Sequence, residues 1–245
     1  RPPEGKFVAS ASPNWALTPI LRAMRRSLST PQATIPSPMN IVFDFGAVLF
    51  TWQPALLMQQ TFPLQASTAE AARHLAHQVF AHPDWHAFDQ GLLDTEAVIA
   101  QTAERLDLPP EATRTLVQGI GQRLMPMAET VAILQTLRAR RDAGDGVTAL
   151  YYLSNMPESY ARLLEQRFEF LQWFDGGVFS GDVKHIKPDL AIYQLLQSRY
   201  ALEPCRTLFI DDLKANVASA RSLSWHAIHF ESPQQLQAEL AQFGL

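Results

Sequence analysis

IVFDFGAVL, the stretch at residues 41–49, carries three apolar residues into an aspartate, Asp44. A strand that is apolar on both faces is typical of a parallel sheet, and such sheets bind ligands at the carboxyl ends of their strands. A second stretch, TLFIDD at residues 207–212, repeats the pattern and ends in Asp211 and Asp212. One aspartate after an apolar run is an ordinary turn or cap residue, but two such strands predict acidic side chains gathered at one edge of a sheet.

Two further apolar runs lie between these stretches and also end in polar residues. LYYL at residues 150–153 leads to Ser154, and VFS at residues 178–180 leads to Lys184 and Lys187. A carboxylate can attack phosphorus, a hydroxyl and a lysine can hold phosphoryl oxygens, and further carboxylates can bind Mg²⁺. This set of side chains therefore favours chemistry on a phosphoryl group.

Taken in chain order, these strand ends form four motifs: DFGAVL at residues 44–49, LSN at 153–155, KPD at 187–189 with Ile192 and Tyr193, and FIDD at 209–212 with Asn216. Together they resemble the motifs of the haloacid dehalogenase-like (HAD) hydrolase superfamily, in particular its branch of sugar-phosphatase type. The resemblance covers about residues 39–230. It implies an α/β fold, in which a doubly wound parallel sheet of Rossmann-like topology carries an all-α helical cap inserted after the first strand.

The periodicity of the chain predicts where this insertion lies. Helical spacing of apolar residues begins near Pro54 and continues to Met127, with start signals at Ser67-Thr68-Ala69-Glu70, Asp94 and Pro109-Pro110. From Ala128 onward, helices and strands alternate, which favours a doubly wound sheet. We therefore expect a HAD-like core at residues 39–53 and 128–245 and a helical cap at residues 54–127.

Residues 1–38 differ in composition from the rest of the chain. They are rich in Pro and Ser, and they contain several basic residues but a single acidic residue, Glu4. Such a leader resembles an organelle transit peptide. The interpretation that we favour is a disordered extension, or upstream sequence ahead of a true start at Met39.

Composition limits the function classes. The 245 residues are 47% hydrophobic and carry a net charge of −4, with a pI near 6.0. This balance argues against nucleic acid or an anionic membrane as the main partner. Cys205 is the one cysteine, so neither an internal disulfide nor a Cys-based zinc site is expected. We expect a cytoplasmic protein, and the sequence gives no indication of its oligomeric state.

The family resemblance implies a nucleophile and a metal site. Asp44 matches the carboxylate that attacks phosphorus and forms an aspartyl-phosphate. Mg²⁺ would be held by Asp44, the backbone carbonyl of Gly46 and Asp212, because it prefers oxygen ligands. Asp211 matches a neighbouring position, and Asn216 would hold the same loop. We expect the carboxylates of Asp44 and Asp212 within about 5 Å of each other.

The resemblance also implies a phosphate-binding set. Ser154 would donate its hydroxyl to a phosphoryl oxygen, and Asn155 would lie beside it. Lys187 would neutralise the charge that develops on the phosphoryl group. Lys184 is the competing lysine, and Pro188 favours Lys187 because proline follows the lysine in the family pattern.

One position departs from that pattern. Most phosphatases of the superfamily have a second aspartate two residues after the nucleophile, where this chain has Gly46. A general acid of this kind contributes about 10²–10⁴-fold. His86 or Asp89 of the cap would contact the substrate and replace it, or the substrate has a good leaving group such as an anomeric sugar phosphate, or the protein is a poor catalyst.

The interpretation that we favour is a Mg²⁺-dependent phosphatase acting on a small phosphorylated metabolite, for instance a sugar phosphate. One alternative is a 2-haloacid dehalogenase, which attacks carbon without a metal, but Gly46 and the Asp211-Asp212 pair argue against it. The other is a catalytically weak HAD-fold protein that binds a ligand or acts as a regulator.

Overall fold

The computed structural model of the protein describes residues 38–245. The predictions for the N-terminal leader concern residues 1–38. All of these residues except residue 38 lie outside the described range. Among the described residues, the structure contains no helix with the length and apolar character required to cross a membrane.

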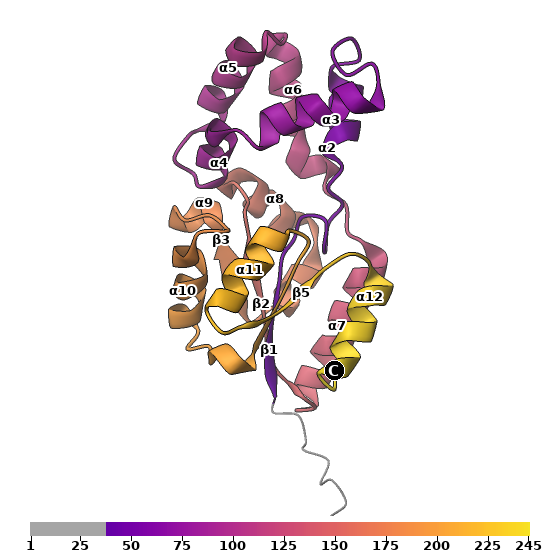
Figure 1. Cartoon of the computed structure of the whole chain (residues 1–245), viewed down its shortest axis with the longest axis vertical. Helices are drawn as coiled ribbons and strands as arrows, with labels where there is room; N and C mark the ends of the chain where they lie inside the picture. The colour runs from indigo at the N-terminus through magenta and orange to yellow at the C-terminus, as the bar shows by residue number, and fades with distance from the viewer. Residues whose placement is uncertain (1–37) are drawn as a thin grey trace, which may run out of the picture. The chain divides into compact units, whose positions relative to one another are not determined.

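A five-stranded parallel sheet forms the centre of the described chain (Figure 1). The strand order is β3-β2-β1-β4-β5, with β1 at Met39–Phe43, β2 at Val147–Ser154, β3 at Gly176–Phe179, β4 at Thr207–Asp211 and β5 at His226–His229. The first strand lies in the middle, between β2 and β4. The polar residues that follow these three strands are therefore neighbours in space.

Helices cover both faces of the sheet, and successive residues of β1 pack against helices on opposite faces. Ile41 and Phe43 point into one apolar cluster, whereas Val42 points into the other. The first cluster includes residues of α7 (Ala128–Asp142), α8 (Glu158–Arg167) and α12 (Pro233–Gln242), and the second includes residues of α10 (Leu190–Arg199) and α11 (Lys214–Ser222). All three strand residues are fully buried, which explains the continuous apolar run in the sequence. The doubly wound parallel sheet is confirmed.

The first five of the six helices between β1 and β2 form the insertion, and Figure 1 shows them beyond the carboxyl ends of the strands. They are α2 (Pro54–Thr61), α3 (Ala69–Phe80), α4 (Pro83–Asp89), α5 (Thr95–Leu106) and α6 (Pro110–Arg123). The insertion packs against α8 and against α9 (Ser180–Val183). An all-α insertion after the first strand is confirmed, while its behaviour as a separate cap domain at residues 54–127 stays a prediction.

One local prediction was wrong in detail. The residue that caps α3 is Thr68, whose hydroxyl accepts a hydrogen bond from the backbone N–H of Ala71, so the helix starts one residue later than the capping box at Ser67 predicts. In contrast, Asp94 caps its helix as predicted.

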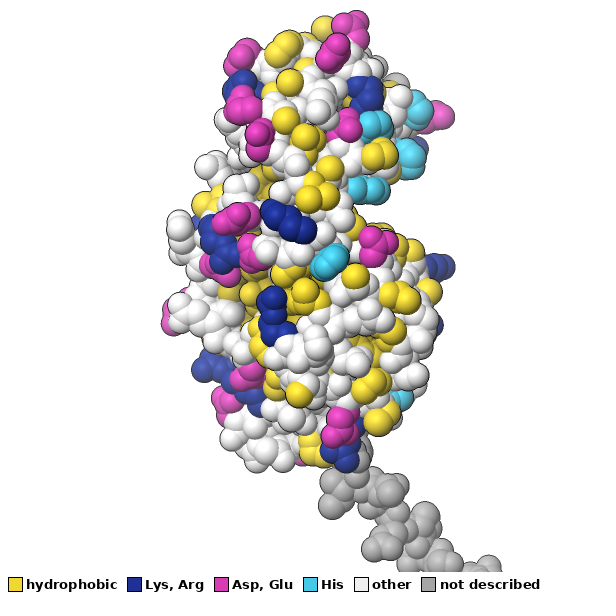
Figure 2. Space-filling model, turned by 90° about the vertical axis from the view of Figure 1, so that its left-hand side faces the viewer, with side chains coloured by type: hydrophobic (Ala, Val, Ile, Leu, Met, Phe, Trp, Pro, Cys, Tyr) yellow, Lys and Arg dark blue, Asp and Glu magenta, His cyan; other side chains and the backbone are white. Residues whose placement is uncertain are grey.

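The surface agrees with a nearly balanced charge. On the face shown in Figure 2, Lys and Arg side chains are interspersed with Asp and Glu side chains, and hydrophobic side chains gather below the helical insertion. The face in this view therefore lacks the continuous basic surface that would follow a polyanion.

Candidate active site

Three neighbouring strands deliver their end residues to one pocket. Asp44 follows β1, Ser154 ends β2, and Asp211 and Asp212 end and follow β4. Carboxylate oxygens of Asp44, Asp211 and Asp212 all lie within 4.8 Å of one another. The sequence-based prediction that Asp44 and Asp212 share a site is thus confirmed in its geometry, because parallel strands end at the same edge of the sheet.

Lys187 lies in the middle of this acidic group. Its side chain is almost fully buried, and its Nζ lies 2.8 Å from Asp44 Oδ1 and 2.7 Å from Asp211 Oδ2. Burial alone would lower the pKa of Lys187, but the two carboxylates outweigh it and raise the pKa. Lys187 is therefore a fixed positive charge among these carboxylates.

Asn155 holds this lysine in place. Its Nδ2 donates to the carbonyl of Lys187 at 2.9 Å, and its Oδ1 accepts from the Lys187 N–H at 2.8 Å. That Asn155 also binds phosphate stays a prediction. Its carbonyl oxygen and one amide hydrogen are engaged with the backbone of Lys187, and only the remaining amide hydrogen is free to reach a ligand.

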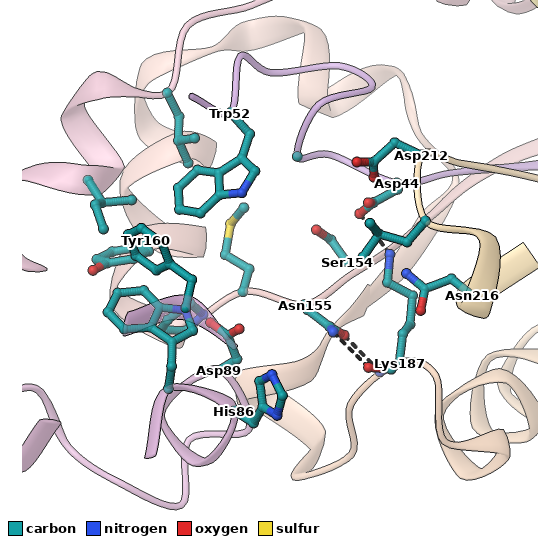
Figure 3. A pocket seen from close by; sticks show the side chains of 18 residues that line it. Asp44, Trp52, His86, Asp89, Ser154, Asn155, Tyr160, Lys187, Asp212 and Asn216 are labelled. Atoms are coloured by element: carbon teal, nitrogen blue, oxygen red, sulfur yellow. Dashed lines mark hydrogen bonds and ion pairs between the residues drawn. The ribbon is translucent and has the colours of Figure 1, made fainter. Parts of the chain in front are cut away.

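The two neighbouring aspartates have different surroundings. Asp211 is fully buried and accepts hydrogen bonds from Lys187 Nζ, Asn216 Nδ2 and the backbone N–H of Leu213. Asp212 is half-buried and lines the pocket, with its carboxyl beside that of Asp44 (Figure 3). The carboxylate of Asp211 is thus occupied by hydrogen bonds within the protein, whereas the carboxylate oxygens of Asp212 are free to contact a ligand.

The acidic group fits a hard divalent cation. Burial raises the pKa of Asp44 to about 7, opposed by Lys187 and reinforced by Asp211 and Asp212. Burial and Asp211 likewise raise the pKa of Asp212 to about 6. A bound cation would favour the charged forms of both groups. Together with the carbonyl of Gly46, which lines the same pocket, these oxygens are the ligands that Mg²⁺ prefers.

Of two further residues from the sequence analysis, Ser154 lies in the pocket and Lys184 does not. Ser154 is buried at the floor of the pocket, and its hydroxyl makes no hydrogen bond to any residue in the described range 38–245. Lys184 is not in the pocket, since its Nζ donates to the carbonyls of Gly91 and Gly181 at 2.6 and 3.2 Å. The choice of Lys187 over Lys184 is therefore correct in its geometry.

The opposite wall of the pocket comes mainly from the helical insertion. His86 and Asp89 of α4 both line it, as the sequence analysis predicted, and Figure 3 shows them across the pocket from Asp44. The remaining lining is mostly apolar and aromatic, and the cavity has a volume of about 240 Å³. The apolar residues that sequence analysis missed are Trp52, Phe80, Trp85, Ile120, Leu124 and Tyr160.

Sequence signals for this wall are weak. Its apolar members come from α3, α4, α6 and α8 and from the segments that contain Trp52 and Leu124, and each has the sequence pattern of an ordinary core residue. Of this wall, the sequence analysis identified His86 and Asp89. Only the packing of α4 and α6 against α8 shows which aromatic residues face the acidic group.

Comparisons with known proteins agree with this architecture. No family model matches the chain. The chain is 28% identical over 204 residues to the sesquiterpene phosphatase astK of Aspergillus oryzae, covering 82% of this chain and 94% of that protein.

Two solved structures share the fold. A HAD family enzyme of Bacteroides thetaiotaomicron, bt-2542, in complex with magnesium and inorganic phosphate, superposes with a TM-score of 0.62 at 16% identity, over 82% of this chain and 99% of that chain. The L-2-haloacid dehalogenase of Xanthobacter autotrophicus superposes with a TM-score of 0.57 at 19% identity, over 83% and 82% of the two chains. The fold implied by the four motifs is thus confirmed.

Proposed function

We propose that this chain, which has the fold and the four motifs of the haloacid dehalogenase-like hydrolases, is a Mg²⁺-dependent phosphatase of small organic phosphates. One observation carries the proposal. A buried carboxylate, a buried lysine, a free hydroxyl and an acidic pair converge at one end of a pocket whose other walls are mostly apolar. The similarity to a protein named as a phosphatase, over most of both chains, supports the same conclusion.

The arrangement explains how the chain would carry out the reaction. Asp44 attacks phosphorus, the bond to the alcohol oxygen breaks, and an aspartyl-phosphate forms on Asp44. Lys187 and Ser154 hold the phosphoryl oxygens while charge develops on them. Water then attacks phosphorus and releases phosphate. Mg²⁺, held by Asp44, the Gly46 carbonyl and Asp212, would supply the positive charge that offsets the repulsion between the carboxylate and the phosphate.

The cavity favours an apolar alcohol over the sugar that the sequence analysis considered. Apart from His86 and Asp89, the wall opposite the acidic group presents aromatic and aliphatic side chains, and these offer few partners to sugar hydroxyls. An unpaired hydroxyl at an apolar wall loses its hydrogen bonds to water, which costs free energy. The relative named as a sesquiterpene phosphatase supports an isoprenoid phosphate as the substrate class.

The dehalogenase alternative has less support. One solved structure of similar fold is a haloacid dehalogenase, but its sequence identity of 19% supports the fold alone. The Asp212 carboxylate, which lies within 4.8 Å of those of Asp44 and Asp211, has no part in a reaction that needs no metal, and the three carboxylates repel one another in the absence of a cation.

The test is a phosphate-release assay with farnesyl phosphate, glucose 6-phosphate and p-nitrophenyl phosphate, each with Mg²⁺ and with a chelator. We expect farnesyl phosphate to have the highest kcat/KM and all activity to require Mg²⁺. Asp44→Asn should reduce turnover to background with an unchanged circular dichroism spectrum. Activity of Asp44→Asn within about tenfold of wild type, or turnover of a 2-halo acid without metal, would contradict the proposal.

A further inference from the structure

A phosphatase with this site needs a proton donor that its first motif does not supply. Gly46 lines the pocket but has no side chain, and an added Cβ there would meet no atom within 4 Å. When an alcohol leaves phosphorus, its oxygen needs a proton unless the alcohol is itself acidic. In an in-line displacement the leaving oxygen lies on the side of phosphorus opposite to the nucleophile. With Asp44 as nucleophile, that side faces the wall formed by the helical insertion.

Three side chains of that wall are ionisable. The Tyr160 hydroxyl donates to the carbonyl of Val117, and burial holds its pKa well above the usual value, so it is a poor acid. The His86 side chain is exposed to solvent. Asp89 is half-buried and lines the pocket, and its carboxyl makes no hydrogen bond or ion pair within residues 38–245. Figure 3 shows Asp89 directed toward the space between the two walls.

The backbone of Asp89 is fixed to the core. Its carbonyl accepts a hydrogen bond of 2.6 Å from Ser180 Oγ, and the same Oγ accepts one of 2.8 Å from the N–H of Met156. Two residues later, the carbonyl of Gly91 accepts from Lys184 Nζ at 2.6 Å. The end of α4 is therefore attached to the segments that follow β2 and β3, while the Asp89 side chain stays free. A backbone held in place at these two points supports the positioning that a catalytic group requires, and the carboxyl keeps its proton available for transfer.

We propose that Asp89 is the proton donor that Gly46 cannot supply, an inference that rests on the phosphatase function proposed above. As Asp44 bonds to phosphorus and the phosphorus–oxygen bond breaks, the Asp89 carboxyl gives its proton to the leaving alkoxide, and the neutral alcohol departs. The resulting Asp89 carboxylate then takes a proton from the water that attacks the aspartyl-phosphate. Phosphate leaves, Asp44 is restored, and Asp89 is again protonated.

The electrostatic surroundings of Asp89 agree with this role. Desolvation raises its pKa to about 8, against the opposing effect of Lys187, so the carboxyl is protonated at neutral pH. The other ionisable groups around it are His86 on its own helix, Tyr160 of α8 and Lys184 after α9. A carboxylic acid that keeps its proton at pH 7 can serve as a general acid.

The first experiment compares leaving groups. Asp89→Asn should lower kcat/KM for farnesyl phosphate by about 10²–10⁴-fold and that for p-nitrophenyl phosphate by less than about tenfold, because nitrophenolate needs no proton. The matched control is Glu104→Gln, which changes an exposed acid of the same insertion and should leave both rates unchanged. His86→Asn should also leave the ratio of the two rates unchanged. An equal loss on both substrates in Asp89→Asn, or a selective loss in His86→Asn, would overturn the proposal.

The second experiment needs no variant. In wild type, kcat/KM for farnesyl phosphate should fall as pH rises through about 8, because the protonated form of Asp89 is lost there. The p-nitrophenyl phosphate profile should lack this decrease. Identical profiles for the two substrates would overturn the proposal even if Asp89→Asn did not fold.

The third experiment is a rescue. Because a side chain at position 46 has open space, Gly46→Asp in the Asp89→Asn background should recover at least about tenfold of the lost alkyl phosphate activity. A purely structural role of Asp89 predicts no recovery. Failure of the inference is distinct from failure of the phosphatase proposal, since only the latter would leave Asp44→Asn active or all phosphates unhydrolysed.

Discussion

At the scale of single residues, the site depends on how three buried charges are arranged. Lys187 forms ion pairs with both Asp44 and Asp211, at 2.8 and 2.7 Å, and each of the three side chains is less than a tenth exposed. A buried charge that loses its partner is costly, because neither water nor a counter-charge replaces it. Asp211 also accepts from Asn216 and Leu213, so it is the residue on which the loop after β4 depends.

We therefore expect Asp211→Asn to be strongly destabilising. The new amide brings hydrogens toward the donors of Lys187 and Asn216, so the loop cannot satisfy all of them. The free energy of unfolding in urea should fall by about 3 kcal/mol. Asp44→Asn is the matched control. It leaves the pair between Lys187 and Asp211 intact and relieves repulsion from the other carboxylates, so its loss should be much smaller. Equal losses in the two variants would contradict this account.

At the scale of elements, the start of α3 shows that a local sequence pattern can predict a helix and still misplace its first residue by one position. The segment before α3 contains two adjacent hydroxyl residues, Ser67 and Thr68. The sequence pattern predicts Ser67 as the cap because Glu70 lies three residues later. In the structure Thr68 has the extended backbone of a capping residue, and its Oγ1 accepts from the N–H of Ala71 at 3.1 Å.

This difference can be measured by comparing the two hydroxyls. Thr68→Ala should lower the free energy of unfolding by about 1 kcal/mol, the usual contribution of a helix cap. Ser67→Ala should change it by less than about 0.5 kcal/mol, the range of ordinary surface substitutions. Chemical denaturation of the two variants provides the comparison. A larger loss for Ser67→Ala would show that the helix begins where the sequence pattern places it.

At the scale of the whole described molecule, the candidate site joins segments that are far apart in the sequence. Asp44 comes from the first strand, Asp89 from the insertion, Lys187 from the loop before α10 and Asp212 from the loop after β4. A cation bound by Asp44 and Asp212 would therefore connect two loops of the folded protein that the unfolded chain does not hold together. Binding to the folded state alone stabilises it by mass action.

Mg²⁺ should accordingly raise the unfolding temperature of the wild-type protein. At about one hundred times its Kd, the added stability should be about 2.7 kcal/mol. Asp212→Asn should abolish this shift, and Glu104→Gln, the exposed control, should retain it. Thermal unfolding with and without Mg²⁺ measures the effect without any substrate. A full Mg²⁺ shift in Asp212→Asn would place the cation elsewhere.

The sequence by itself determined the features that depend on local order. Apolar runs long enough to be buried on both faces identified the strands, and their polar ends identified Asp44, Ser154, Lys187 and Asp212 as candidates. Helical periodicity after residue 54 identified the insertion. These signals are reliable because strand burial, helix spacing and turn chemistry act between residues that are close in the chain.

Only the tertiary structure decided how residues meet across the chain. It shows that most of the Asn155 side chain binds the backbone of Lys187 and that hydrogen bonds occupy Asp211. It also shows that Lys184 lies outside the pocket. It also brought aromatic residues of separate helices together as one apolar wall and left the carboxyl of Asp89 free. Sequence patterns do not contain these outcomes, because burial and hydrogen-bond partners depend on the packing of elements that are distant in the chain.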